Sequence, residues 1–345
     1  MNLQIAMLLG QDGLTNGAIY ALLALSILLV FTVTRILLIP QGEFVTYGAM
    51  TMATIQGGKP LRMVWFLLAM AVIHFAFELY RAVRSPAGFR FPSKALIMPI
   101  YVILLVIMVR HLPLAELPMV VQVVLTMALV VPFGPLVYGV FFQSIASASS
   151  LVLLIVSIAV HVVMVGVGLL MFGPEGSRTT PFSEAGLELG PVTFNSQSLW
   201  VLVLSLLLII SLYQFFEHTL RGKALRATAV SRLGAQLMGI SPVLAGKTSF
   251  LLASLIGALS GILIAPITTI YFDSGFLISL KGFVGAIIGG LASYPIAALG
   301  ALAVGMVEVF STFWASSYKE VIVFTLILPF LLWRSLKSRG VEEEE

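Results

Sequence analysis

Long apolar segments alternate with short polar ones along almost the whole chain. The apolar runs cover residues 14–34, 61–80, 95–112, 118–142, 151–172, 199–216, 248–270 and 321–333. A run of about 20 apolar residues is long enough to cross a bilayer as an α-helix. Because a helix satisfies its own backbone hydrogen bonds, it is stable in hydrocarbon. The pattern predicts an all-α polytopic transmembrane helical bundle with about eleven crossing or half-crossing elements.

The segment that follows the first span departs from this pattern. Pro40, Gly42 and Glu43 interrupt an apolar stretch, and the part that continues to Gln56 is short for a full crossing. Broken segments occur at membrane depth where they pack within protein or line a cavity, and they are frequent at transporter binding sites. We therefore expect a half-crossing or re-entrant element, with Gln41, Gly42 and Glu43 as candidates for a translocation path.

Basic residues concentrate in three polar segments: residues 81–94, residues 217–247 and the residues after Trp333. Short loops rich in lysine and arginine stay on the cytosolic side of a membrane. This places the N-terminus outside and the C-terminus inside, with a cytosolic tail at residues 334–345. The acidic-leaning segment 173–198 and residues 271–281 are then expected to face outside.

The loop at residues 217–247 is both basic and patterned. It carries five basic residues and no acidic ones between Arg221 and Lys247. Val230, Leu233 and Leu237 recur at the spacing of one helix face. Gly234 and Gly239 interrupt the run, and Pro242 prevents simple continuation of a helix. The pattern predicts a short amphipathic helix, a bend and a stop on the membrane surface. A solvated loop that only determines topology is an equal alternative.

Composition supports a membrane protein and excludes several chemistries. Of 345 residues, 59% are hydrophobic and 10% charged, and the mean hydropathy is +1.08. The net charge of +4 lies in loops, so it indicates topology and not nucleic-acid binding. The absence of cysteine excludes disulfides, thiolate catalysis and cysteine-bound metals. The first residues have no basic region, so they are not expected to be a cleaved signal peptide.

Few side chains in the apolar segments carry chemistry. Glu43 and Glu308 are the acidic residues deepest in apolar sequence, and an intramembrane carboxylate is a functional candidate. The alternatives are a favourable charge at a helix start for Glu43 and a structural contact in the bundle for Glu308. His161 stands alone in its span, which indicates hydrogen-bonded packing. His74 and His218 lie near span ends, where no function is required of them.

No catalytic or metal-binding pattern is legible, so the sequence predicts no enzyme and no metal site. Residues 241–248 nearly spell a phosphate-binding loop. However, Ser241 replaces the first glycine, Pro242 lies inside, and an apolar span follows where a soluble helix is needed. Lys247 is interpreted as a lysine at the membrane boundary. If ATP drives this protein, another chain binds it.

The basic loop resembles the cytoplasmic loop of the permease subunits of branched-chain amino acid ABC transporters. That family reads G-R-A-x-R-A-x-A, followed about ten residues later by L-x-G-I. The matching positions are Gly222, Lys223, Ala224, Arg226, Ala227, Ala229, Leu237, Gly239 and Ile240, with lysine at 223 where the family has arginine. In the family this loop is the coupling helix, which sits in a groove of the ATP-hydrolysing subunit. The resemblance implies that contact with the ATPase involves Arg226, Ala227, Ala229, Leu233, Leu237, Gly239 and Ile240.

Other segments resemble the same family, with departures. The opening span, residues 13–31, resembles G-L-x-x-G-x-x-Y-A-L-x-A-L, and residues 289–295 resemble the family's G-G-x-G-S-x-P motif. Residues 35–49 resemble R-x-x-N-F-A-H-G-[DE]-F-x-x-x-G-A, but Ile39, Pro40 and Gln41 replace Phe-Ala-His. Residues 61–112 are interpreted as an extra insertion of two spans.

The resemblance implies one transmembrane permease domain over residues 1–345, in a multi-pass protein of the inner membrane. It implies an ATP-driven importer of branched-chain or related amino acids. The expected partners are a second permease subunit in a homo- or heterodimer, two ATP-binding cassette subunits and an external substrate-binding protein. No cofactor is expected in this chain, because ATP is bound by the partner. Urea or short amides are alternative substrates, and a self-sufficient secondary transporter or channel is an alternative of another class.

Overall fold

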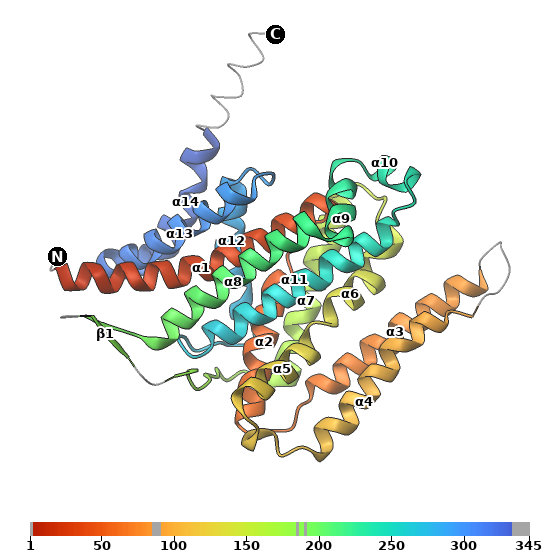
Figure 1. The fold of residues 1–345 in the computed structure, drawn as a ribbon, viewed down its shortest axis with the longest axis horizontal. Helices are drawn as coiled ribbons and strands as arrows, with labels where there is room; N and C mark the ends of the chain where they lie inside the picture. The colour runs from red at the N-terminus through yellow and green to blue at the C-terminus, as the bar shows by residue number, and fades with distance from the viewer. Residues whose placement is uncertain (1–2, 85–90, 184–185, 190–191, 333–345) are drawn as a thin grey trace, which may run out of the picture. The chain divides into compact units, whose positions relative to one another are not determined.

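The computed structural model describes residues 3–84, 91–183, 186–189 and 192–332, and these form a bundle of helices with one short β-hairpin (Figure 1). Within this described part, seven helices are long and apolar enough to cross a membrane: Gln4–Thr34, Met63–Val83, Met119–Ile145, Ser150–Phe172, Ser196–His218, Pro242–Ile264 and Tyr294–Leu332. Two shorter apolar helices are Ile97–His111 and Ser274–Ile288. The prediction of an all-α polytopic membrane bundle is confirmed.

The elements follow one another along the chain with short connections. They are α1 (Leu3–Thr34), α2 (Gln41–Gln56), α3 (Met63–Val83), η1 (Ser93–Leu96), α4 (Ile97–His111), η2 (Leu114–Glu116), α5 (Met119–Val130), α6 (Phe133–Val137), the π-helix η3 (Tyr138–Phe142), η4 (Gln143–Ile145), α7 (Ser150–Phe172), β1 (Leu187–Leu189), β2 (Val192–Phe194), α8 (Ser196–His218), α9 (Leu220–Val230), α10 (Arg232–Leu237), α11 (Pro242–Ile264), α12 (Ser274–Ile288), α13 (Tyr294–Ala315), η5 (Ser316–Tyr318) and α14 (Lys319–Thr325).

The chain divides into two compact units. One unit takes in Met1–Leu28, Pro181–Gln214 and Leu277–Glu345, and the other Leu29–Thr180 and Phe215–Phe276. The helices α1, α8 and α12 each contribute to both. We describe the contacts of each unit separately.

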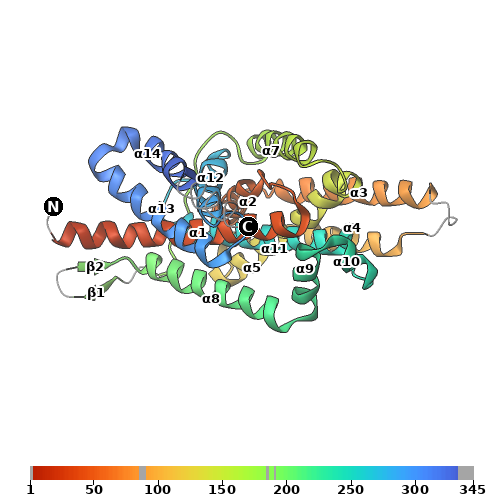
Figure 2. The same cartoon turned by 90° about the horizontal axis from the view of Figure 1, so that it is seen from above.

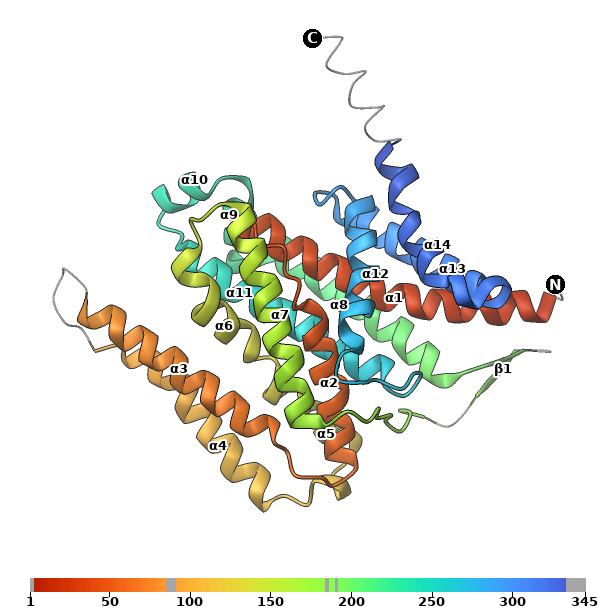
Figure 3. The ribbon, with the colours of Figure 1, turned by 180° about the vertical axis from the view of Figure 1, so that it is seen from behind.

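In the larger unit, α2 packs closely on α11 because small residues line their contact. A Cβ atom at Gly48 would collide with the backbone of Ala258, and one at Gly261 with the backbone of Val45. Helices in a membrane associate through such close packing, since water exclusion cannot drive their contact. The other side of α2 lies against α5 and α7, and Figure 3 shows α7 passing across α2. The helices α3 and α4 run side by side in the same unit.

The irregular backbone before α2 is held by a side chain of α7. Arg35 takes a positive φ of 61° and ends α1, as its position after the apolar run predicted. The hydroxyl of Ser157 donates to the Leu37 carbonyl at 2.7 Å and accepts from the Ile39 N–H at 3.0 Å. Non-helical backbone persists at membrane depth only when protein groups satisfy it in this way. The predicted break and the short following helix are therefore confirmed.

The expected continuous span at residues 118–142 is divided into α5, α6 and η3. Pro135 has no N–H, so it cannot donate to the Val131 carbonyl as a helix requires. That carbonyl accepts instead from the Ser254 hydroxyl on α11 at 2.7 Å and from the Gly134 N–H at 3.2 Å. Pro135 therefore accounts for the division of this span, and the Ser254 hydroxyl satisfies the carbonyl that Pro135 leaves free.

Three further boundaries differ from expectation. Residues 274–281 form the first half of α12, although 271–281 were expected as an external loop. Residues 282–310, which are rich in glycine and alanine, are broken by a turn in which Gly290 and Leu291 have φ of 63° and 54°, so they belong to two helices. Pro242 occupies the first turn of α11, six residues before the expected start, because proline is tolerated there. Trp333 and the tail at 334–345 lie outside the described residues.

The segment 173–198 contains the hairpin of β1 and β2, which leads into α8 (Figure 2). The strands are antiparallel, with Leu187 opposite Phe194 and Leu189 opposite Val192.

In the smaller unit, glycines bring α13 against α1 and against α12. A Cβ atom at Gly305 would collide with the backbone of Gly17, and one at Gly285 would press on Ala301. The close approach has the same physical basis as the contact of α2 with α11.

Candidate functional site

The start of α2 holds three predicted path residues, and all three are buried. Gln41, Gly42 and Glu43 form its first turn, preceded by Pro40. A Cβ atom on Gly42 would collide with the backbone of Gly275, and one on Gly275 with that of Gly42. The first turns of α2 and α12 therefore touch backbone to backbone, which only glycine permits.

Glu43 faces His161 across this junction. The carboxylate is fully buried, and its Oε1 lies 3.1 Å from Nδ1 of His161 on α7. The imidazole also faces the ring of Phe276 on α12, with centroids 4.8 Å apart. His161 stands alone in its own span, but the fold brings a carboxylate 118 positions away in sequence against it. Helical spacing within one span could not reveal this pair.

Gln41 points to a different neighbour. Its Nε2 donates to the Ala253 carbonyl on α11 at 3.1 Å, and its Oε1 has no hydrogen-bond partner among the described residues. Gly257 leaves the space that this side chain and Phe44 occupy. Gln41 and Glu43 thus anchor the first turn of α2 to two different helices.

Glu308 on α13 belongs to the other unit and takes part in a buried network. Lys281 on α12 places its Nζ 2.5 Å from Oε1 of Glu308 and 3.2 Å from Oε1 of Glu320. The hydroxyl of Tyr20 on α1 donates to Oε2 of Glu308 at 2.5 Å. Four helices of one unit meet at these side chains. The structural contact considered for Glu308 is present.

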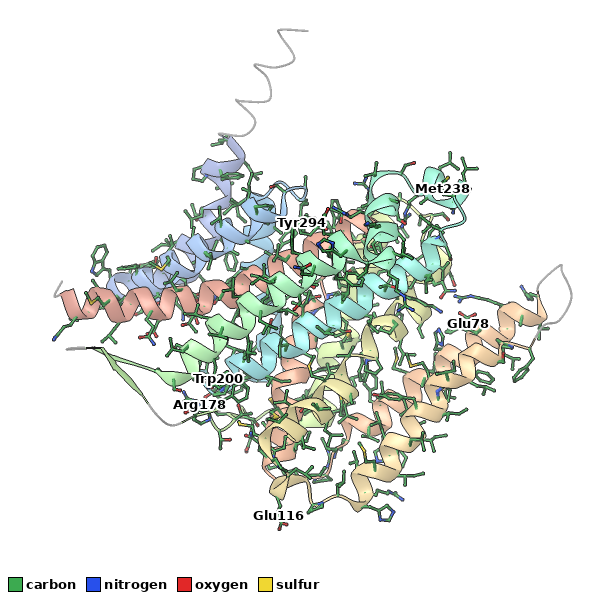
Figure 4. The ribbon with its side chains drawn as sticks, viewed as in Figure 1. Glu78, Glu116, Arg178, Trp200, Met238 and Tyr294 are labelled. Atoms are coloured by element: carbon green, nitrogen blue, oxygen red, sulfur yellow. The ribbon has the colours of Figure 1, made fainter. Side chains whose placement is uncertain are left out.

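A second polar cluster involves residues for which no role was predicted. Lys247 on α11 lies 3.5 Å from Glu78 on α3, and its Nζ is 3.4 Å from Nε2 of His74. Arg81 pairs with the same carboxylate at 3.0 Å. Figure 4 shows Glu78 on the side of α3 toward α11. His74, Glu78 and Lys247 also line a cavity of about 320 Å³ whose other walls are apolar. This cluster joins the hairpin of α3 and α4 to α11.

The basic loop consists of α9 and α10, each closed by a polar cap. Thr219 accepts from the Gly222 N–H at 3.0 Å at the start of α9, and Ser231 accepts from the Gly234 N–H at 3.1 Å at the start of α10. Gly239 has φ of 81° and ends α10, as a helix stop requires. The helix face predicted for Val230, Leu233 and Leu237 is wrong, because Val230 ends α9 and the two leucines lie on α10. The break lies at Ser231, whose extended backbone and side-chain cap start a new helix.

Four apolar side chains of the loop are exposed at the surface of the chain. Val230, Leu233, Leu237 and Met238 are 87%, 69%, 81% and 82% exposed. Figure 4 shows Met238 at the outer edge of the loop. Large apolar groups exposed together on a polar loop are typical of protein or membrane interaction sites. We call these four residues the loop patch.

The other predicted coupling residues surround the loop patch. Ala227 and Gly239 are exposed, while Ile240 is half-buried. Arg226 pairs with Glu217 at 2.9 Å. Ala229 is half-buried and packs on the apolar cluster formed by Leu29, Val33, Leu225 and Ala245, so it supports α9 from within.

Arg232 is a residue of the loop that sequence reasoning missed. Its guanidinium donates to the carbonyl of Thr34, the last residue of α1, at 2.8 Å and to the Ala146 carbonyl at 3.0 Å. The planar guanidinium fork suits two such acceptors at once. The basic charge that indicated topology here also ties α10 to the ends of two other segments.

Residues 241–248 follow α10 and form a helix start. Ser241 accepts from the Leu244 N–H and Pro242 opens α11. A phosphate-binding loop would need a strand before it. Its exclusion as a nucleotide site agrees with this geometry. Among the described residues, no group of three or more His, Asp or Glu side chains is placed to hold a metal.

Comparison with known proteins identifies the family of this chain. Residues 11–331 match the family model described as branched-chain amino acid transport system / permease component. The permease protein BraD of the high-affinity branched-chain amino acid transport system of Pseudomonas aeruginosa is 28% identical over 166 residues, which cover 48% of this chain and 53% of that relative. The corresponding LivH of Escherichia coli K12 is 29% identical over 143 residues, covering 41% and 46%. The matched parts thus span about half the length of these relatives. This multi-pass membrane protein belongs to the family of permease components of branched-chain amino acid transport systems.

Proposed function

We propose that this chain is the membrane-spanning permease subunit of an ATP-driven importer in the inner membrane. It translocates branched-chain or related amino acids that an external binding protein delivers. It works with a second permease subunit and two ATP-hydrolysing subunits. The family match and the names of the relatives support this assignment.

The loop patch is the observation that carries the proposal. Its four side chains are more than two-thirds exposed on a loop whose helices are capped and whose base is tied down by Arg232. A permease needs such a rigid projection to receive the force of ATP hydrolysis. A carrier that works alone has no comparable need for exposed leucines on a polar loop. We therefore assign the loop patch to contact with the ATPase.

The path is assigned to the helix starts of the larger unit. Discontinuous helices of transporters direct their ends at the substrate site. Here α2 begins with Gln41, Gly42 and Glu43, and α12 begins against them at Gly275. Glu308 remains a candidate on the strength of its buried carboxylate, in the smaller unit.

Reconstitution tests the function directly. Vesicles that hold this chain with its second permease and ATPase subunits should transport leucine only under two conditions. ATP must be present on the side of the ATPase subunits, and the binding protein must be present on the opposite side. Uptake without ATP, driven by an ion gradient, would identify a secondary transporter instead. Competition by urea or acetamide in place of leucine, valine or isoleucine would assign the importer to short amides.

The membrane orientation makes a separate prediction. In this cysteine-free chain, single cysteines at Ser85 and Ser231 should react with impermeant maleimide only from the cytosolic side. Cysteines at Ser177 and Ser183 should react from outside. Ser85 lies outside the described residues, and the other three are at least partly accessible. Labelling of residue 177 from the cytosol would overturn the proposed topology.

A further inference from the structure

The junction of α2, α7 and α12 contains more hydrogen-bond acceptors than the described residues satisfy. The Oε2 of Glu43 and the Oγ1 of Thr46 have no partner among the described residues, and the Oε1 of Glu43 has only the ion pair with Nδ1 of His161 at 3.1 Å. Both residues are fully buried, and both lie on the same face of α2, three positions apart. Thr46 faces Gly275 at the start of α12. Buried polar atoms without partners are uncommon, so each requires an explanation.

The unsatisfied groups share one chemical character. A carboxylate and a hydroxyl oxygen accept hydrogen bonds, and their natural ligand is a cation with several N–H donors. His161 is the one described residue that forms an ion pair with Glu43, and it is charged only when protonated. The ring of Phe276 covers the imidazole and adds an aromatic face, which also attracts cations.

We infer that Glu43, Thr46 and His161 form a binding site for the ammonium group of the transported amino acid, in which His161 and the substrate ammonium compete for the place beside the Glu43 carboxylate. The inference rests on the proposed function for the identity of the substrate. The site itself rests on the geometry of the larger unit. An ammonium group offers three donors, which matches the two carboxylate oxygens and the Thr46 hydroxyl.

The structure holds this site closed. Glu43 and Thr46 are fully buried, and the backbone contact of Gly42 with Gly275 lies beside them. A substrate reaches the carboxylate when the first turns of α2 and α12 separate. In the closed form His161 is the partner that faces Glu43, so the buried carboxylate is not left without one. Glu43 is therefore paired with His161 in the empty state and with the substrate ammonium in the loaded state.

The test uses the full-length chain, with the subunits that co-purify, in lipid nanodiscs. Binding of leucine is compared with that of 2-hydroxy-4-methylpentanoate, which replaces the ammonium by a hydroxyl and keeps the rest. The unaltered protein should prefer leucine by about tenfold or more, as expected for charge-assisted hydrogen bonds. Glu43→Gln should remove most of this preference, and Thr46→Val should reduce it. Saturation-transfer NMR detects such weak binding without any need for transport.

The histidine is tested by leucine binding in the same nanodiscs. Because the imidazole of His161 lies beside Oε1 of Glu43, His161→Gln should change the affinity for leucine. The matched control is His218→Gln, at the exposed end of α8, which should keep the original affinity. Equal affinities for leucine in His161→Gln, His218→Gln and the unaltered protein would overturn the competition.

The outcomes separate the site from the function. Equal binding of leucine and its hydroxy analogue by the unaltered protein overturns the ammonium site, whatever drives transport. A full preference for leucine in Glu43→Gln does the same. Preferential leucine binding that is lost in Glu43→Gln, without ATP-dependent uptake, supports the site and contradicts the proposed importer.

Discussion

Replacing Leu233 by aspartate should separate this permease from its ATPase subunit while leaving it folded in the membrane. The Leu233 side chain is 69% exposed, so its change removes little internal packing. In a complex the same side chain would be buried against the partner, where an unpaired charge is costly. Apolar anchors at the centre of an interface commonly contribute about 2 kcal/mol or more, enough to lose the partner during purification. We expect co-purification of the ATPase and ATP-dependent uptake to fall together.

Two control variants make this result specific. Leu233→Met keeps an apolar side chain of similar volume and should retain the partner. Gly239→Asn should also be tolerated, because asparagine adopts the left-handed backbone of that residue more readily than other side chains. Gly239→Val should impair coupling, since a β-branched residue is strained at φ of 81° although no atom lies within 4 Å of its Cβ position.

Ala229→Asp should also impair coupling, but by disturbing the folding of the loop. Ala229 packs on Leu225 within the apolar cluster beneath α9, so its aspartate would loosen the loop and remove coupling indirectly. If Leu233→Asp, Gly239→Val and Ala229→Asp all keep the ATPase bound and transport normally, the loop only determines topology.

Removing the Lys281 charge should cause the largest loss of stability of any change considered. Lys281→Met leaves the buried carboxylate of Glu308 and the partly exposed carboxylate of Glu320 without their shared cation. Breaking a buried pair by removing one partner typically costs about 3–5 kcal/mol. We expect a clearly lower thermal midpoint in detergent, together with reduced yield.

A second substitution, added to Lys281→Met, shows whether the loss of stability comes from the uncompensated charge. In Lys281→Met with Glu308→Gln, the buried negative charge is reduced, and much of the stability should return. The exposed pair of Arg226 and Glu217 is the matched control. Arg226→Gln should alter stability by less than about 1 kcal/mol, because exposed pairs contribute little. If Lys281→Met is no less stable than Arg226→Gln, the network around Glu308 is not structural, and its role as a path residue gains support.

Several features of this protein follow from local sequence alone. The apolar runs determine the helices, because only a helix satisfies the backbone inside a membrane. Pro40 and Gly42 determine that α2 begins after a break. Gly239 and Pro242 determine where α10 ends and α11 starts, since one permits a positive φ and the other lacks an N–H.

Other features depend on contacts between distant segments. The division of the 118–142 span needs Ser254 of α11 to satisfy a carbonyl that Pro135 leaves free. The break at Ser231 has a local signal, because a serine can cap a helix by accepting from the N–H of the residue three positions later, here Gly234. The apolar spacing of Val230 and Leu233 instead favoured one helix. Ala229 carries no sign in the sequence that it faces inward.

The buried ion pairs are the features that could least be predicted from the sequence. His161 has no charged neighbour within its own helix, and Glu308 is separated from Lys281 by a turn and parts of two helices. Sequence determines that each of these side chains lies in an apolar span, where a charge requires compensation. Which partner supplies that compensation depends on helix packing, because small residues such as Gly42 and Gly275 bring distant helices close enough for side chains to meet.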